Sequence, residues 1–190
     1  SIITGMTDMA HSVWTPAQVR ELDRRASADY GIPGHELMTR AGQAAFGIAR
    51  ERWPDARRWL LLCGSGNNAG DGYVVARLAL AAGLEVTVVA LSDPARLQGD
   101  AATAWRDFES AGGTTQAFAP GMIDSSDLVV DALLGTGLQR PVSGDYLAAI
   151  EAMNAGARPV LALDVPSGLD STNGTVLGAA VWADVTVTFV

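Results

Sequence analysis

Short, continuously apolar segments alternate with longer helical patterns over most of this chain, and this alternation constrains the fold more than any other feature. Strands are expected over residues 59–63, 86–91, 128–131, 160–164 and 185–190, with helices between them over residues 71–82, 97–111 and 145–155. Strands that are apolar on both faces are typical of a parallel sheet covered by helices on both sides. The pattern therefore predicts an α/β fold, a Rossmann-like three-layer sandwich with a mainly parallel central sheet.

Two more helices are expected before the first strand. Thr15 and Pro16 provide an N-cap followed by proline at the first helical position, and Gly31 ends this helix. A second helix is expected over residues 35–52. We thus predict a flexible tail over residues 1–14 and one domain over residues 15–190. The last expected strand runs to the end of the sequence, which favours a domain that belongs to a longer chain.

The charged and reactive residue types exclude several functions. The formal net charge is −8, and a surface this acidic repels polyanions, so we expect no nucleic-acid partner. All 13 basic residues are arginines, which excludes a Schiff-base lysine, a P-loop lysine and the Tyr-x-x-x-Lys pair of many small dehydrogenases. His11, His35 and the single Cys63 leave Ser-His-Asp triads and His/Cys metal sites poorly supplied.

One apolar run, over residues 73–91, has the length of a membrane span. Arg77, Gly83 and Glu85 interrupt it, so that it divides into a helix and a strand. Residues 1–15 lack the basic start and apolar stretch of a signal peptide. We expect a cytoplasmic enzyme that has no membrane partner.

Glycines and polar residues crowd the segment after the first expected strand, Gly64-Ser65-Gly66-Asn67-Asn68-Ala69-Gly70-Asp71-Gly72. Glycine lets the backbone turn sharply and approach a ligand closely, while free N–H groups at a helix start bind phosphate. As a bare G-x-G-x-x-A match this is weak evidence for an ordinary dinucleotide fingerprint, and a tight Gly/Asn turn is the alternative. Four glycines, two adjacent asparagines and an aspartate in nine residues exceed what a turn requires.

Two more polar clusters follow expected strands. Asp131 ends a buried strand, where its carboxylate needs a cation, a hydrogen-bond donor or a ligand; a helix cap or a salt bridge to an arginine is the alternative. In the loop after it, residues 135–137 (Gly-Thr-Gly) can wrap a phosphate and Arg140 can add a positive charge. The third cluster, residues 164–170, reads Asp-Val-Pro-Ser-Gly-Leu-Asp, with a proline turn as the alternative. Its serine does not stand in G-x-S-x-G, so a hydrolase nucleophile elbow is excluded.

The three clusters together supply oxygen ligands and no sulfur or imidazole. Asn68, Asp131 and Ser167 are the candidates, and hard cations prefer such oxygen sites. With only one carboxylate among the three, the charge suits a monovalent ion better than calcium.

These three motifs, in this order, resemble the NAD(P)H-hydrate epimerase family, also called the YjeF N-terminal domain. The resemblance begins near residue 17 and continues to residue 189, so it covers nearly the whole chain. Ala69 departs from the family, which usually has glycine there; alanine is tolerated unless the backbone needs a positive φ.

The resemblance implies an isomerase that interconverts the R and S epimers of NADHX and NADPHX in nicotinamide nucleotide repair. It implies a potassium ion at Asn68, Asp131 and Ser167, and substrate contacts from Asn67, Asn68, Ala69, Gly70, Asp71, Gly135, Thr136, Gly137, Leu138, Gln139, Arg140, Pro141 and Asp164. Our hypothesis makes Asp164 the general acid/base. Asp71 is the second candidate, with capping of the helix that it opens as the alternative. A homodimer and a dehydratase, fused or separate, are the partners that the resemblance implies.

Two other functions stay open at this point. An NAD(P)-dependent oxidoreductase would use the first motif, but lysine is absent and Glu85 starts its strand instead of ending it. A non-catalytic dinucleotide-binding or scaffold module would keep the fold without the reaction, although all three polar motifs are present.

Overall fold

The computed structural model describes residues 15–189, and their strands form one six-stranded sheet in the order β3-β2-β1-β4-β5-β6. Every neighbouring pair of strands is parallel. The strands are β1 (Arg58–Cys63), β2 (Glu85–Ala90), β3 (Thr115–Gln116), β4 (Leu128–Ala132), β5 (Val160–Leu163) and β6 (Val185–Val187). The predicted α/β class with a parallel central sheet is confirmed. The tail predicted over residues 1–14 lies outside the described residues.

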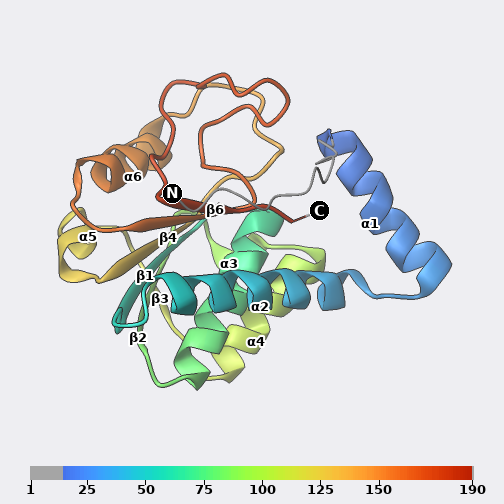
Figure 1. Ribbon diagram of the computed structural model, residues 1–190, viewed down its shortest axis with the longest axis horizontal. Helices are drawn as coiled ribbons and strands as arrows, with labels where there is room; N and C mark the ends of the chain where they lie inside the picture. Colours follow the sequence, from blue (N-terminus) through green and yellow to red (C-terminus); the bar gives the residue numbers. More distant parts are fainter. Residues whose placement is uncertain (1–14, 190) are drawn as a thin grey trace, which may run out of the picture.

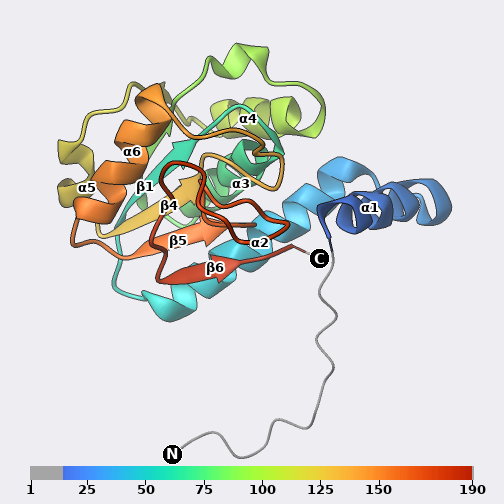
Figure 2. The same ribbon diagram turned by 90° about the horizontal axis from the view of Figure 1, so that it is seen from above.

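Six α-helices and one short 3-10 turn are present in the described residues. They are α1 (Pro16–Tyr30), α2 (Gly34–Arg52), α3 (Asn67–Ala81), η1 (Pro94–Arg96), α4 (Gly99–Ser110), α5 (Gly121–Ser125) and α6 (Gly144–Ala155). Figure 1 shows α2, α3 and α4 on one face of the sheet and α5 and α6 on the other. Helix α1 lies to the side, beyond the start of α2, in both views (Figures 1 and 2).

Two apolar cores, one on each face of the sheet, hold the three layers together. Successive side chains of a strand point to opposite faces. Trp59, Leu61 and Cys63 accordingly pack with α2, α3 and α4, whereas Leu60 and Leu62 pack with α6 on the opposite face. All five of these side chains are almost completely buried. Burial on both faces explains why the strands read as unbroken apolar runs in the sequence.

The apolar run over residues 73–91 is divided as predicted. It contributes most of α3 and the whole of β2, joined by a turn in which Gly83 has a φ of 72°. Within residues 15–189, no helix is both long and apolar enough to cross a membrane.

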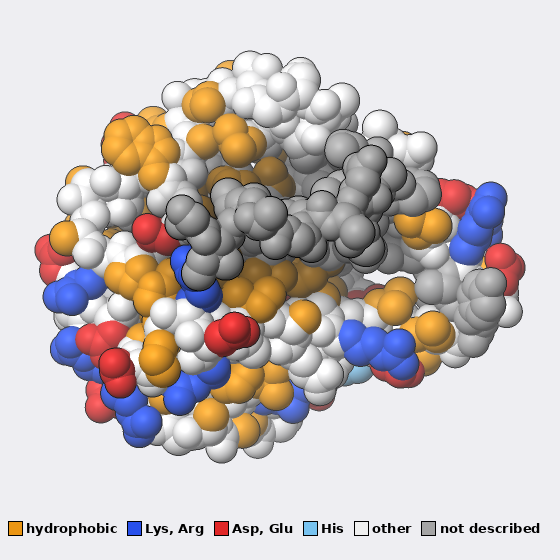
Figure 3. Space-filling view, in the orientation of Figure 1, with side chains coloured by type: hydrophobic (Ala, Val, Ile, Leu, Met, Phe, Trp, Pro, Cys, Tyr) orange, Lys and Arg blue, Asp and Glu red, His pale blue; other side chains and the backbone are white. Residues whose placement is uncertain are grey.

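Because all six strands are parallel, the loops that follow them gather at one edge of the sheet. The chain runs outward in opposite directions from β1 and β4, which are adjacent although not consecutive. Ligands of open α/β sheets bind at such a switch point, beyond the carboxyl ends of the strands. Figure 3 shows charged side chains at the lower left of one face, around the starts of β1 and β2, and few over the loops at the top.

The structure corrects several expected boundaries. Helix α3 begins at Asn67, four residues before the predicted start, because the Asn-rich segment joins the helix instead of forming a loop. Strand β6 ends at Val187 and strand β5 at Leu163, so Asp164 lies outside the sheet. Strand β3 and helix α5 are too short to give a periodic sequence pattern.

Candidate functional site

The three residues predicted to bind a cation come together around the backbone of Leu134, in the loop after β4. The Asn68 amide nitrogen donates to the Leu134 carbonyl at 3.1 Å, and the Leu134 N–H donates to the Ser167 hydroxyl at 2.8 Å. The Ser167 hydroxyl in turn donates to Asp131 Oδ1 at 2.6 Å. One residue from each of the three polar motifs is thereby joined in a single network at the β1–β4 switch point.

Asp131 is completely buried, and its hydrogen-bond donors among the described residues are all neutral. Its carboxylate accepts hydrogen bonds from the Ser167 hydroxyl, from the Ser167 N–H at 2.8 Å and from the Leu133 N–H at 3.2 Å. None of the ion pairs among residues 15–189 includes it. Burial raises the pKa of Asp131 to about 6, although the hydrogen bonds from Ser167 and Leu133 oppose this shift. The arginine salt bridge that the sequence left open is not formed in the described part of the chain.

An unsatisfied oxygen lies in the same network. Asn68 Oδ1 is buried and has no hydrogen-bond partner among the described residues, while the other end of the amide is used by Leu134. A buried acceptor without a donor is costly, and a cation satisfies it. One buried carboxylate, one unsatisfied amide oxygen and one serine hydroxyl are a donor set that fits a hard monovalent cation such as potassium.

Asp164, the candidate acid/base, adopts an uncommon backbone conformation. Its φ is 64°, and it is the only residue other than glycine with a positive φ in the described chain. Two hydrogen bonds to the end of the last strand and to the residue after it stabilise this geometry. The Asp164 N–H donates to the Val187 carbonyl at 2.8 Å, and the Thr188 hydroxyl donates to the Asp164 carbonyl at 3.1 Å. A residue held in this region against its preference is typical of a functional site.

Gly135 joins Asp164 to the cation network. A Cβ at position 135 would lie 3.2 Å from Asp164 Oδ2 and 3.3 Å from the Asn68 Cβ. The glycine backbone therefore fits directly between the two side chains, which explains the glycine without a turn requirement.

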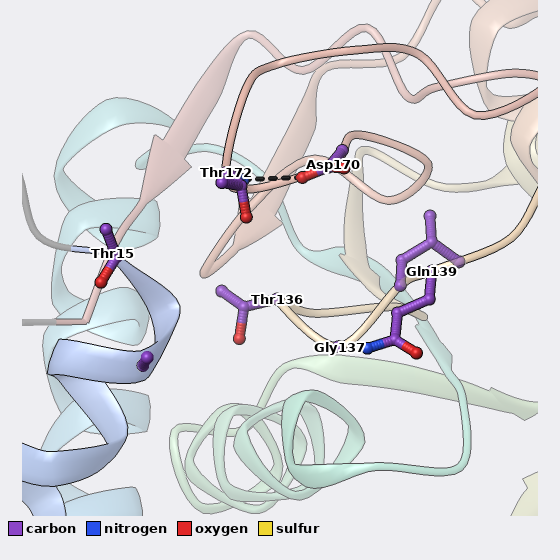
Figure 4. A pocket seen from close by; sticks show the side chains of 8 residues that line it. Thr15, Thr136, Gly137, Gln139, Asp170 and Thr172 are labelled. Atoms are coloured by element: carbon purple, nitrogen blue, oxygen red, sulfur yellow. Dashed lines mark hydrogen bonds between the residues drawn. The ribbon is translucent and has the colours of Figure 1, made fainter.

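A cavity of about 490 Å³ is lined by residues of the loop that continues from Gly135, although Asn68, Asp131, Asp164 and Ser167 do not line it. The predicted substrate residues Thr136, Gly137, Leu138 and Gln139 form one wall. Asp170, the last residue of the third motif, and Thr172, shortly after it, form another. Figure 4 shows Thr15, at the start of α1, facing these loops from a third side, and Ala17 also lines the cavity. Arg140 and Pro141, which follow in the loop, are exposed and are not part of this lining.

The first motif forms the start of α3 rather than an open loop. Gly66 is the N-cap, Asn67 is exposed, and the helix buries the side chains from Asn68 onward. Gly70 and Gly72 allow close packing, since a Cβ would lie 2.6 Å from Met38 at the first and 2.6 Å from Ala132 at the second. The backbone of Ala69 is helical, with no positive φ, so the departure from the family's glycine is tolerated there.

Asp71 is the fifth residue of α3 and is buried, so the suggestion that it opens and caps this helix is wrong. The error follows from the low helix propensity of the preceding Asn and Gly residues, which tertiary packing overrides here.

Several residues at this edge of the sheet were missed by the sequence reasoning. Leu134 contributes only its backbone, which no side-chain motif reveals. Thr188 was assigned to a strand, and Thr15 only to a helix cap. Asp170 closed the third motif, but nothing in the sequence indicated that it lines a cavity with the loop after β4.

Comparison with known proteins shows the family to which this chain is similar. The family model described as YjeF-related protein N-terminus matches residues 34–190. The chain is 46% identical over 180 residues to the bifunctional NAD(P)H-hydrate repair enzyme Nnr of Escherichia coli K12, covering 95% of this chain and 35% of that protein. It is 39% identical over 179 residues to the NAD(P)H-hydrate epimerase of Rhodopirellula baltica, covering 92% of this chain and 73% of that enzyme.

A crystal structure of the yeast protein YNL200c has the same fold, with a TM-score of 0.82 at 19% identity, over 92% of this chain and 79% of the yeast chain. The chain thus spans about a third of the length of the bifunctional relatives, 35% for the E. coli enzyme, but 73% of the length of the epimerase from R. baltica. With a family model that matches most of its length and three polar motifs united at one sheet edge, this chain belongs to the family of YjeF-related protein N-termini.

Proposed function

We propose that this chain is an NAD(P)H-hydrate epimerase, which interconverts the R and S epimers of NADHX and NADPHX. The main support for the proposal is that Asp164 and Asn68 meet on either side of Gly135 at the switch point of a parallel sheet, and that the residues directly after Gly135 line a cavity. The similarity to the R. baltica epimerase, of which the chain covers 73%, supports the same function.

The substrate is a dinucleotide, and the start of α3 suits its pyrophosphate. The free N–H groups at a helix N-terminus bind anions without the help of a lysine side chain. This matters here because the chain contains no lysine. The N-cap Gly66 and the exposed Asn67 leave this end of α3 accessible. Residues 135–141 then cover the hydrated nicotinamide half, with Thr136 to Gln139 lining the cavity.

The reaction inverts C6 of the hydrated ring, which carries a hydroxyl group next to the ring nitrogen. Asp164 in its acid form protonates that hydroxyl, the C6–O bond breaks, and water leaves while the nitrogen lone pair forms an iminium. Water then adds to the opposite face of C6 and returns its proton to Asp164. No electrons are gained or lost, and the acid is regenerated.

Asn68, Asp131 and Ser167 would hold potassium in this proposal. When bound, the ion supplies a fixed positive charge beside the substrate loops. Asn68 Oδ1 would gain the partner, and the Asp131 carboxylate the countercharge, that each lacks among the described residues. The Leu134 backbone, already bonded to Asn68 and Ser167, would orient the turn that leads to Gly135.

A dehydratase that accepts one epimer would consume the product, as a fused domain or as a separate protein. The names of the E. coli relative and of similar proteins describe bifunctional repair enzymes, of which this chain matches about a third, 35% for E. coli. A longer native chain and a homodimer remain predictions.

The test is to incubate the purified chain with the R epimer of NADHX and to follow the R/S ratio by chromatography. Buffers containing potassium and tetramethylammonium are compared. We expect the epimers to equilibrate faster than they do spontaneously, and faster in potassium. A folded protein without acceleration in either buffer would indicate a binding module, and hydride transfer with unmodified NAD would indicate an oxidoreductase.

A further inference from the structure

Two hydroxyl groups that none of the predicted motifs includes meet at the same edge of the sheet. Ser92 Oγ and the Tyr146 hydroxyl lie 2.9 Å apart, and both side chains are partly buried. Ser92 follows β2, whereas Tyr146 is in the first turn of α6, 54 residues away. Only one of the two hydroxyl hydrogens can lie between the oxygens, so the pair keeps a second one to donate.

The pair lies next to the start of the first motif. A Cβ at Gly64 would lie 3.2 Å from the Tyr146 oxygen, so this hydroxyl reaches the carboxyl end of β1. Pairing between β1 and β2 extends to this point, because the Leu91 N–H donates to the Cys63 carbonyl at 2.9 Å. Ser92 and Tyr146 thus occupy the β2 side of the switch point, and Asp164 occupies the β5 side.

The distance across the sheet between Asp164 and the Ser92–Tyr146 pair can be compared with the length of a dinucleotide. With about 4.8 Å between neighbouring strands, the ends of β5 and β2 are about 14 Å apart across β4 and β1. A dinucleotide with its hydrated nicotinamide at Asp164 and its pyrophosphate at the start of α3 therefore extends its adenosine toward β2. This placement rests on the proposed function.

The residue that follows Ser92 in the sequence is acidic. Asp93 directly follows Ser92, is exposed, and accepts a hydrogen bond from the Ala95 N–H at 3.0 Å, which fixes the carboxylate at the end of β2. In dinucleotide-binding α/β folds, an acid after the second strand binds the ribose hydroxyls of NAD, and a 2′-phosphate is disfavoured there by like charge. The sequence indicated no such acid, since Glu85 begins the strand.

We propose that Ser92, Asp93 and Tyr146 form the subsite for the adenosine ribose and that they favour a free 2′-hydroxyl over a 2′-phosphate. The enzyme consequently prefers NADHX to NADPHX. Arg96 ends the 3-10 turn that Asp93 caps and is the nearest cation along the chain. A 2′-phosphate bound here would need a positive charge, and Arg96 is the residue that would supply it. Arg96 is therefore the control position for the preference assigned to Asp93.

The first experiment measures binding without turnover, by calorimetry with AMP and with adenosine 2′,5′-bisphosphate. We expect the unmodified chain to bind AMP about tenfold more tightly, and Tyr146→Phe and Ser92→Ala each to weaken AMP about fivefold, as the loss of one hydrogen bond does. Asp93→Asn should bring the two affinities together. Arg96→Gln, and Glu151→Gln on the exposed face of α6, should leave the ratio unchanged.

The second experiment compares kcat/KM for R-NADHX and R-NADPHX in the same variants. A preference for NADHX that Asp93→Asn removes supports the subsite. Equal use of both substrates, or a preference that follows Arg96, overturns it. If no variant epimerises either substrate but Tyr146→Phe still weakens AMP, the subsite stands and the proposed reaction fails. If epimerisation proceeds and the three residues have no effect on AMP, only the subsite fails.

Discussion

Asp127 and Asp131 lie at opposite ends of the same strand, and their environments differ sharply. Asp127, just before β4, accepts hydrogen bonds from the backbone N–H groups of Arg57 and Arg58 at 3.0 and 2.9 Å, and from the Arg58 guanidinium at 2.6 Å. The Arg58 side chain holds the pKa of Asp127 well below its usual range. Asp131, at the carboxyl end, is buried among neutral donors, and burial raises its pKa to about 6.

The difference separates structure from function within one sheet. At the amino end, Arg58 supplies the countercharge for Asp127, so this carboxylate links β4 to β1 and requires no bound ligand. At the carboxyl end the described chain provides no ion pair for Asp131 and no donor for Asn68 Oδ1. An ionised group buried without compensation lowers stability, and its presence is explained when a bound cation offsets the cost.

The largest expected effect is a loss of catalysis when an aspartate at the carboxyl edge of the sheet is changed, and no such loss when one at the amino edge is changed. Asp164→Asn should lower kcat for epimerisation about 100-fold or more, because an amide does not transfer the proton. Asparagine tolerates the positive φ of this position, so the fold should persist. Asp127→Asn is the matched control, since it makes the same chemical change at the amino end and should leave kcat within about twofold. Near-normal activity of Asp164→Asn would contradict the assignment and make Asp71 the next residue to test.

The next effect is on the free energy of unfolding, which should depend on pH through Asp131. The folded pKa of Asp131, about 6, exceeds the ordinary value of 3.8, so the folded state binds more protons between these values. The contribution of Asp131 is therefore most favourable below about pH 4 and is lost as the pH rises through about 6, by at most about 3 kcal/mol.

Potassium should reduce this loss, because it binds the ionised carboxylate. We expect the free energy of unfolding in urea to be larger in potassium chloride than in tetramethylammonium chloride at pH 7, and the two values to approach each other at pH 4.5. A potassium effect of equal size at both pH values, or none at either, would contradict a cation at Asp131.

The smallest effect concerns the amino end. Arg58→Ala removes the charge that lowers the pKa of Asp127, while the two backbone donors remain. The stability that the Arg58 side chain contributes is present above pH 4 and is lost as the pH falls through the lowered pKa, so unmodified and variant chains should converge in acid. The modest difference at pH 7, measured by urea unfolding, should be the same in both salts. If the salts differ, the two ends of β4 are coupled, and the comparison no longer holds.

The fold and the family could be predicted from the sequence because their signals are local. Strands β1, β4 and β5 are runs buried on both faces, and β2 is partly buried. The intervening helices carry an apolar pattern or lie between clear strand signals. Both predictions are confirmed, the first by the parallel sheet and the second by the family match over residues 34–190. The roles assigned to individual site residues remain predictions.

The structural features that the sequence did not predict depend on contacts between distant segments. Helix α3 starts early because Gly70 and Gly72 pack against α2, α4 and β4, which overcomes the poor helix propensity of Asn67 and Asn68. The positive φ of Asp164 depends on bonds to Val187 and Thr188, more than 20 residues later. No local pattern reveals either interaction.

The sequence by itself determined which chemical groups follow which strands: glycines and amides after β1, an aspartate at the end of β4, and an aspartate and a serine after β5. Parallel pairing then obliges these groups to share one edge of the sheet. Only the tertiary structure decided how they meet: Asn68 and Ser167 on either side of the Leu134 backbone, Asp164 against Gly135, and Tyr146 beside Ser92. The reason is physical, since periodicity reports burial and direction along one segment, whereas a binding site depends on distances between atoms of different segments.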